Sequence, residues 1–165
     1  MNRNRSRLAL AVLAVCSLVL AACAPRQQAL SDEAAYQRFV GTWVNTEYPG
    51  TLMKSQVTVI RPDHVGEDWR RPDSTRAEGQ WAIKVKKTWV DEKGNTYCQF
   101  YLTRTLPASM RYSVGALMRV DKKGRVWEMC DKPTGFGRIP TEDEAAYPER
   151  IDPNLQYYYI YHRKK

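Results

Sequence analysis

The chain has 165 residues, of which 43% are hydrophobic, and a formal net charge of +8 at pH 7. This length is enough for one domain with a buried core and too short for two domains of ordinary size. The basic residues form no run of five, and nucleic-acid binding needs a clustered basic surface. Composition therefore disfavours nucleic acid as a partner.

The first 22 residues have the pattern of a secretory signal peptide. Arginines at positions 3, 5 and 7 precede an unbroken run of apolar and small residues over 8–22. The run has about 15 residues, fewer than the roughly 20 needed to cross a hydrocarbon core, so we do not expect a permanent transmembrane helix. Removing these residues with their three arginines leaves 143 residues with 23 basic and 18 acidic side chains, a net charge near +5.

The leader ends in Leu20-Ala21-Ala22-Cys23, which resembles the lipobox of bacterial lipoproteins. In that family the cysteine thiol receives a diacylglyceryl group and cleavage occurs just before it, so the resemblance implies lipidation at Cys23. Ala24 resembles the outer-membrane sorting pattern, which implies an outer-membrane lipoprotein facing the periplasm. Each buried methylene of the acyl chains would contribute about 0.8 kcal/mol of binding to membrane lipid. The alternative is that an ordinary signal peptidase cuts nearby and Cys23 is incidental.

Two cysteines remain for the folded part of an exported chain. Cys16 leaves with the signal peptide and Cys23 carries lipid, so Cys98 and Cys130 are left. In an oxidising compartment this pair predicts one disulfide, which would stabilise the fold by about 3 to 4 kcal/mol. Two separate buried thiols are the alternative. No histidine lies near either cysteine, so we expect neither a metal site nor a cofactor.

The chain after the leader begins with a tether and a short helix. Residues 23–30 are small and polar, which suits a lipidated tether to a folded domain over 31–165. Ser31, followed by two acidic residues, fits an N-cap and the first turn of a helix over 31–38.

Strands follow, with β-branched and aromatic residues between turns that contain Gly, Pro, Asn and Asp. Seven are expected, and an eighth if 65–70 pairs with its neighbours. In 79–88, Trp81, Ile83 and Val85 alternate with polar residues, which is typical of a half-buried antiparallel strand. The expected strands are 39–45, 54–61, 65–70, 79–88, 97–104, 111–120, 125–130 and 155–163.

A second short helix is expected before the last strand. Thr141 and Glu144 fit a capping box, which predicts two turns over 141–147 that end at Pro148. The short links between strands predict an all-β, antiparallel up-and-down meander that closes into an eight-stranded barrel, because closure removes exposed sheet edges. Such a barrel is filled by side chains or holds one small ligand.

The first strand begins with Gly41-Thr42-Trp43 after a short helix, and this layout resembles the lipocalin and calycin barrels. In that family the Trp packs across the barrel floor against a basic residue late in the last strand. Trp43 matches the first position, and Arg163 is the candidate for the second. The resemblance implies a lipocalin-like barrel that carries a small apolar ligand. The alternative role for Trp43 is that of an ordinary core aromatic residue.

Candidate binding residues come from the aromatic content and from one acidic residue. Five Trp and ten Tyr exceed what a minimal core needs, and concave sites are often lined by such residues. Glu128 points into the barrel if it shares a face with Cys130, or outward if Trp127 and Met129 point in. The aromatic residues expected to line a cavity, with core or surface packing as the alternative for each, are Trp81, Phe100, Tyr157 and Tyr159.

The sequence contains little that indicates catalysis. It has two histidines, His64 and His162, with no nucleophile-elbow motif and no metal-binding spacing, so we expect no enzyme. The preferred function is an envelope-anchored carrier of a small apolar ligand. The alternative is an envelope interaction or inhibitor protein that uses the barrel rim or outer surface.

Overall fold

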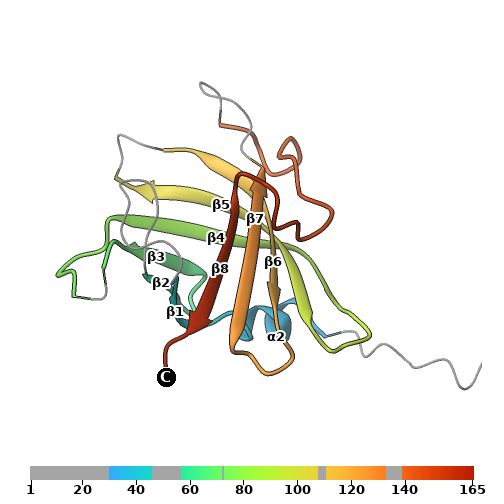
Figure 1. Cartoon of the computed structure of the whole chain (residues 1–165). Helices are drawn as coiled ribbons and strands as arrows, with labels where there is room; N and C mark the ends of the chain where they lie inside the picture. Colours follow the sequence, from blue (N-terminus) through green and yellow to red (C-terminus); the bar gives the residue numbers. More distant parts are fainter. Residues whose placement is uncertain (1–29, 46–56, 72, 108–110, 133–138) are drawn as a thin grey trace, which may run out of the picture.

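The computed structural model describes residues 30–45, 57–71, 73–107, 111–132 and 139–165. They form one closed barrel in which each strand pairs antiparallel with the next and β8 pairs with β1 (Figure 1). The predicted all-β meander is therefore confirmed. The predicted signal peptide, Cys23 and most of the tether lie outside the described residues. The strands are β1 (Gly41–Val44), β2 (Val57–Ile60), β3 (Val65–Trp69), β4 (Gly79–Val90), β5 (Thr96–Leu106), β6 (Ser113–Val120), β7 (Val126–Lys132) and β8 (Tyr158–Arg163).

The eighth strand, which the sequence left conditional, is present. β3 pairs with β2 through Val59 and Glu67, and with β4 through Gly66 and Trp81. Both of its edges are thus hydrogen-bonded, which is why a short segment with two acidic residues holds an extended conformation.

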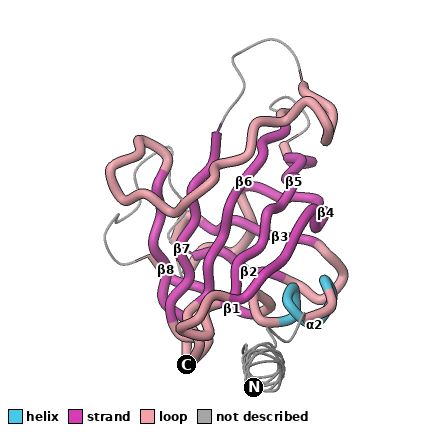
Figure 2. The backbone as a smooth tube through the Cα atoms, turned by 90° about the vertical axis from the view of Figure 1, so that its right-hand side faces the viewer, coloured by secondary structure: helices cyan, strands magenta, loops and turns pink. Residues whose placement is uncertain are grey.

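One helix, α2 (Asp32–Gln37), packs against β4 and β5 at one end of the barrel (Figure 2). The Ser31 side chain accepts a hydrogen bond from the backbone N–H of Ala34 at 3.2 Å, as expected of an N-cap. Tyr36 of the helix is fully buried and meets Phe100 edge-on, with the ring centroids 6.0 Å apart. No helix in the described ranges is long and apolar enough to cross a membrane.

The expected two-turn helix over 141–147 is wrong. The Thr141 N–H donates to Glu144 Oε2 at 3.0 Å, which is one of the two contacts of a capping box, and the Ala145 N–H donates to the Thr141 carbonyl at 3.0 Å, as in the first turn of a helix. The segment then continues without a helix. One turn makes too few hydrogen bonds to offset helix nucleation, and Pro148 prevents extension.

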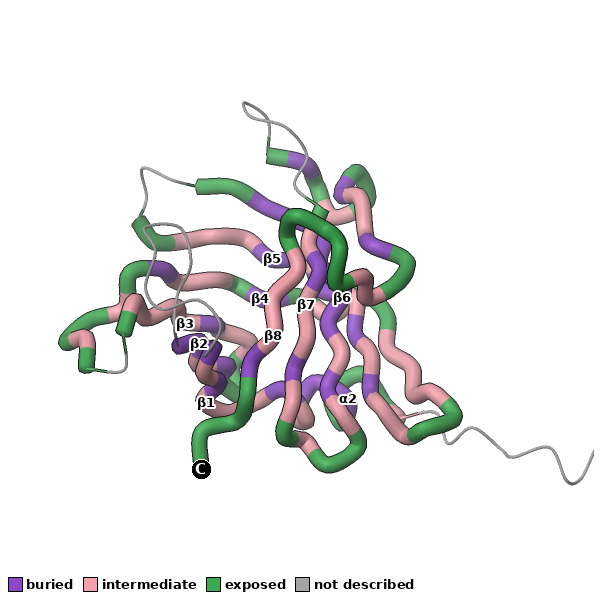
Figure 3. The backbone as a smooth tube through the Cα atoms, viewed as in Figure 1, coloured by how far each residue is buried: buried purple, intermediate pink, exposed green. Residues whose placement is uncertain are grey.

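Buried residues recur along the strands in stripes (Figure 3), because alternate side chains point into the barrel. The row on β5 that begins at Cys98 and the row on β6 that begins at Val114 both lie inside, as the alternation predicts. The interior residues of the strands include Trp43, Ile60, Ile83, Cys98, Phe100, Leu102, Val114, Ala116, Met118, Val120, Trp127 and Tyr161.

The two cysteines do not form the predicted disulfide. Both are free and buried. Cys98 lies opposite Met118 on β6, whereas Cys130 lies opposite Leu117. Neighbouring residues on a strand point to opposite faces, so Cys98 faces into the barrel and Cys130 faces outward. The Cys130 thiol instead accepts a hydrogen bond from the backbone N–H of Asp152 at 3.3 Å.

The end of the barrel beside α2 is closed by Trp43 and Arg163. The indole N–H of Trp43 donates to the Phe39 carbonyl at 2.7 Å, and the Arg163 guanidinium covers the ring at 4.4 Å from its centroid. Arg163 also donates to the Arg38 carbonyl at 2.8 Å. Gly41, with φ of 145°, leaves room for the guanidinium: a Cβ there would lie 3.1 Å from Arg163 Nη1.

Candidate ligand-binding site

The barrel interior contains a cavity of about 120 Å³. It lies toward the strand ends away from α2, beyond the layer formed by Phe39, Trp43 and Phe100, which do not line it. Residues of every strand from β2 to β8, both included, line it. The polar and aromatic lining residues are Thr58, Asp68, Trp81, Arg104, Tyr112, Trp127, Asp131, Tyr159 and Tyr161.

Two of the four predicted aromatic residues line this cavity, Trp81 and Tyr159. Phe100 lies deeper in the core, where its ring meets Phe39 edge-on with the centroids 5.3 Å apart. Tyr157 precedes β8, is 38% exposed and does not line the cavity, so the expectation for it is wrong. Position explains both differences. The Phe100 ring faces the helix, and Tyr157 lies outside the strand ladder.

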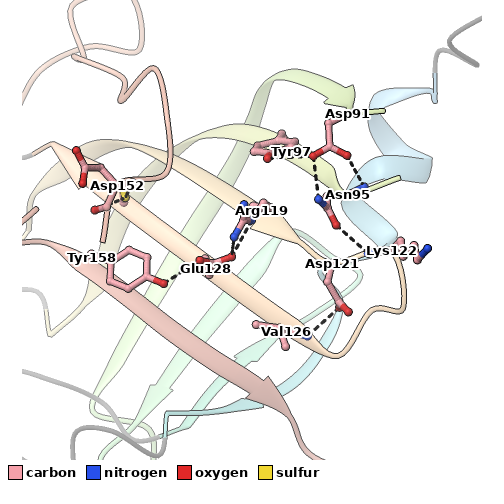
Figure 4. A network of polar contacts seen from close by, with 11 residues as sticks. Asp91, Asn95, Tyr97, Arg119, Asp121, Lys122, Val126, Glu128, Asp152 and Tyr158 are labelled. Atoms are coloured by element: carbon pink, nitrogen blue, oxygen red, sulfur yellow. Dashed lines mark hydrogen bonds and ion pairs between the residues drawn. The ribbon is translucent and has the colours of Figure 1, made fainter. Parts of the chain in front are cut away.

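Glu128 points outward, which is the second of the two arrangements that the sequence left open, so it does not line the cavity. It accepts a hydrogen bond from Arg119 Nε at 2.7 Å, forms an ion pair with the same guanidinium, and accepts from the Tyr158 hydroxyl at 2.8 Å (Figure 4). Trp127 and Met129 point inward on the same strand. Asp131 lies two residues after Met129 on the same face of β7, so it is the acid of this strand that points into the barrel.

Asp68 is held by two donors inside the barrel. The Thr58 hydroxyl donates to Oδ1 at 3.0 Å, and the Trp81 indole N–H donates to Oδ2 at 2.5 Å. Burial raises the pKa of Asp68, although both hydrogen bonds and the nearby Arg104 charge act against this shift. Asp68 therefore has its hydrogen-bond partners within the protein, and it fixes the orientation of the Trp81 ring.

Arg104 is fixed against the aromatic wall and the backbone. Its guanidinium lies over the rings of Trp81 and Tyr112, at 5.2 and 5.9 Å from their centroids. Its Nε donates to the Leu106 carbonyl at 2.9 Å. Gly79 makes room for the group, since a Cβ there would lie 2.7 Å from Arg104 Nη2.

Asp131 differs from Asp68 because its Oδ1 is buried and has no hydrogen-bond partner among the described residues. Burial raises the pKa of the Asp131 carboxyl to about 7. Burial also raises the pKa of Tyr159 and Tyr161, and the Asp131 charge adds to each shift, so both hydroxyls lie within its electrostatic range. The indole N–H of Trp127, on the same wall, also lacks a partner in the described structure.

Three lining residues that sequence reasoning missed carry the charges of the cavity: Asp68, Arg104 and Asp131. A signal for two of them was present. Arg104 continues the inward row of Phe100 and Leu102, and Asp131 continues the row of Trp127 and Met129. Following the alternation to the end of each strand would have placed both inside.

The described residues contain no group of three or more His, Cys, Asp or Glu side chains arranged to hold a metal ion. Comparison with protein-family models, curated proteins and solved structures gives no match to the chain.

Proposed function

We propose that this protein is an envelope lipoprotein, anchored through Cys23, whose lipocalin-like barrel binds a small molecule in its interior cavity. The observation that carries the binding proposal is a cavity of about 120 Å³ that combines aromatic walls with charged groups. Ligand sites in proteins have this composition, with a mostly apolar lining and a few fixed polar groups. A cavity of about 150 Å³ holds benzene, so the buried part of the ligand is about one small ring in size.

The lipocalin-like assignment is supported by topology and by the closed end. The meander has eight strands, and Trp43 of the first strand packs against Arg163 of the last, as the resemblance implies. Closure at this end leaves the opposite end as the route into the cavity.

The ligand we propose is amphipathic. A purely apolar molecule would cover Asp131, whose Oδ1 lacks a hydrogen-bond partner among the described residues, without offering it a polar group, and burying an unpaired charge is costly. The proposal therefore departs from the apolar ligand expected from the sequence. The ligand has a small apolar body against the rings and a polar group near the charged residues.

Cavity binding is testable through two methionines. Met118 and Met129 line the cavity. In the purified protein labelled with ¹³C at the methionine methyl groups, titration with benzyl alcohol, a neutral ring-sized ligand, should shift both signals in a saturable manner. Val114→Phe, which fills the cavity, should abolish the shifts. Val59→Phe, on the outer face of β2, should leave them intact. Unshifted Met118 and Met129 signals would count against the proposed site.

The anchor is tested separately. Mass spectrometry of the protein isolated from its bacterial envelope should find an N-terminal peptide that begins at an acylated Cys23. An unmodified N-terminus at another position would refute the lipoprotein proposal and leave the cavity proposal standing.

A further inference from the structure

We infer that the cavity selects a compact organic cation, a primary amine about one ring in size, whose ammonium group pairs with the carboxylate of Asp131. This inference rests on the proposed function and specifies the chemical class of the ligand. Four features of the cavity support it.

The first feature is the charge balance. The charged residues that line the cavity in the described structure are Asp68, Arg104 and Asp131, two acids and one base. The Arg104 charge acts on Asp68. Burial is the one cause of the Asp131 shift, with no contribution from a neighbouring cation. Asp131 is therefore the cavity acid without a neighbouring positive charge, which a cationic ligand would supply and an anionic ligand would not.

The second feature is the hydrogen bonding of Asp131. Its Oδ1 is buried without a partner, and burying such an oxygen costs free energy unless a donor reaches it. Asp68 already accepts from Thr58 and Trp81. Of the two cavity acids, Asp131 is the one with an acceptor free for a ligand, and an ammonium group supplies three donors.

The third feature is the aromatic surroundings. The charge of Asp131 acts on Tyr112, Tyr159 and Tyr161, three rings that line the same cavity. A cation among aromatic rings gains further stabilisation from their negative faces. Arg104 lies over the rings of Trp81 and Tyr112, and the Tyr161 ring stacks on Trp127 with the centroids 4.6 Å apart, so the aromatic wall around Asp131 is fixed in place.

The fourth feature is size and the fixed position of Arg104. A cavity of about 120 Å³, smaller than the roughly 150 Å³ that holds benzene, limits the buried part of the ligand to about one small ring and excludes a lipid chain. An acid of the same size would need Arg104 as its partner. That guanidinium already donates to the carbonyls of Leu106 and Glu78, at 2.9 and 3.4 Å.

The test compares three ligands of nearly equal shape: benzylamine, benzyl alcohol and benzoate. Calorimetric titration of the purified protein near pH 8 should show benzylamine binding at least about tenfold tighter than benzyl alcohol, with benzoate weakest. Asp131→Asn should reduce benzylamine affinity to that of benzyl alcohol and leave benzyl alcohol unchanged. Glu128→Gln, which changes an outward acid on the same strand, should alter neither affinity.

The outcomes separate the inference from the function on which it rests. If benzyl alcohol binds as tightly as benzylamine while Met118 and Met129 respond, the amine inference is overturned and cavity binding stands. If neither ligand moves these two signals, both are overturned. If Asp131→Asn fails to fold, the wild-type series still decides between the ligands. Lowering the pH to about 5.5 should then weaken the binding of benzylamine alone, because protonation removes the Asp131 charge. The other titratable or charged groups on the cavity wall are Asp68, Arg104, Tyr112, Tyr159 and Tyr161.

Discussion

The guanidinium of Arg163 lies 4.4 Å above the ring of Trp43 and so joins the last strand of the barrel to the first. These residues are also partners in the ladder between β1 and β8. The contact covers the aromatic floor from solvent at the point where the barrel closes. The contact therefore closes the barrel on the side of α2.

Replacing Arg163 by Met should destabilise the barrel. The variant loses the cation–π contact with Trp43 and the hydrogen bond to the Arg38 carbonyl, which together contribute about 1 to 3 kcal/mol. Urea denaturation measures the loss, with Lys165→Met as the control for removing a nearby positive charge. Equal stability of both variants would show that the contact contributes nothing to closure.

Gly41→Ala should destabilise the fold through two effects. The φ of 145° is unfavourable for a residue with a side chain, and the new Cβ would lie 3.1 Å from Arg163 Nη1. We expect a loss of about 1 to 3 kcal/mol in the free energy of unfolding. Gly124→Ala is the control, since Gly124 has φ of 66° with no atom within 4 Å of its Cβ position. If the two variants lose the same amount, crowding against Arg163 has no role.

Asp131 should make the ligand-free protein less stable as the pH rises. Its pKa is about 7 in the folded state against 3.8 for an ordinary aspartate, so the folded state binds more protons than the unfolded chain between these pH values. The free energy of unfolding therefore falls from about pH 4 to pH 7 and is lowest, for this group, above pH 7. Asp131→Asn removes this dependence and should stabilise the protein by about 2 to 4 kcal/mol near pH 8.

Urea denaturation at pH 5 and pH 8 checks this prediction. Asp73→Asn, at an exposed residue, serves as the control for loss of an acidic side chain. An Asp131→Asn variant with the same pH dependence as the wild type would show that Asp131 is not buried as a titrating group.

Both thiols should be protected in the folded protein and free in the unfolded chain. Cys98 and Cys130 are buried, and burial raises the pKa of each thiol, which lowers the fraction of reactive thiolate. Iodoacetamide should therefore modify both only after denaturation, with no reductant needed. Peptide mass spectrometry reads the two sites separately. A disulfide-linked peptide from the unreduced protein would contradict the placement of these residues on opposite faces.

Much of the barrel could be predicted from local patterns, because strands and turns are encoded by alternation and by turn residues. Trp81 was assigned to the correct face for this reason. β7 was harder, since both of its faces carry apolar residues. Cys130 is buried although it points outward, beside Asp152 of a later segment. No pattern within β7 shows that a distant segment covers its outer face, so the sequence leaves the direction of Glu128 open.

The start of β8 could not be predicted from the sequence either. The aromatic run beginning at Leu155 suggested one long strand, yet pairing begins at Tyr158. The backbone N–H of Tyr158 donates to the Leu155 carbonyl, which makes a turn of the residues before it. Tyr157 therefore falls outside the barrel wall, because a turn and a strand can share the same aromatic composition.

The most direct measurement is a crystal structure of the protein with benzylamine bound near pH 8. The proposed site predicts the ring inside the barrel against Tyr159 and Tyr161, with the amine nitrogen about 3 Å from Asp131 Oδ1. Benzylamine bound only on the outer surface, with side chains or water in its place inside the barrel, would contradict it.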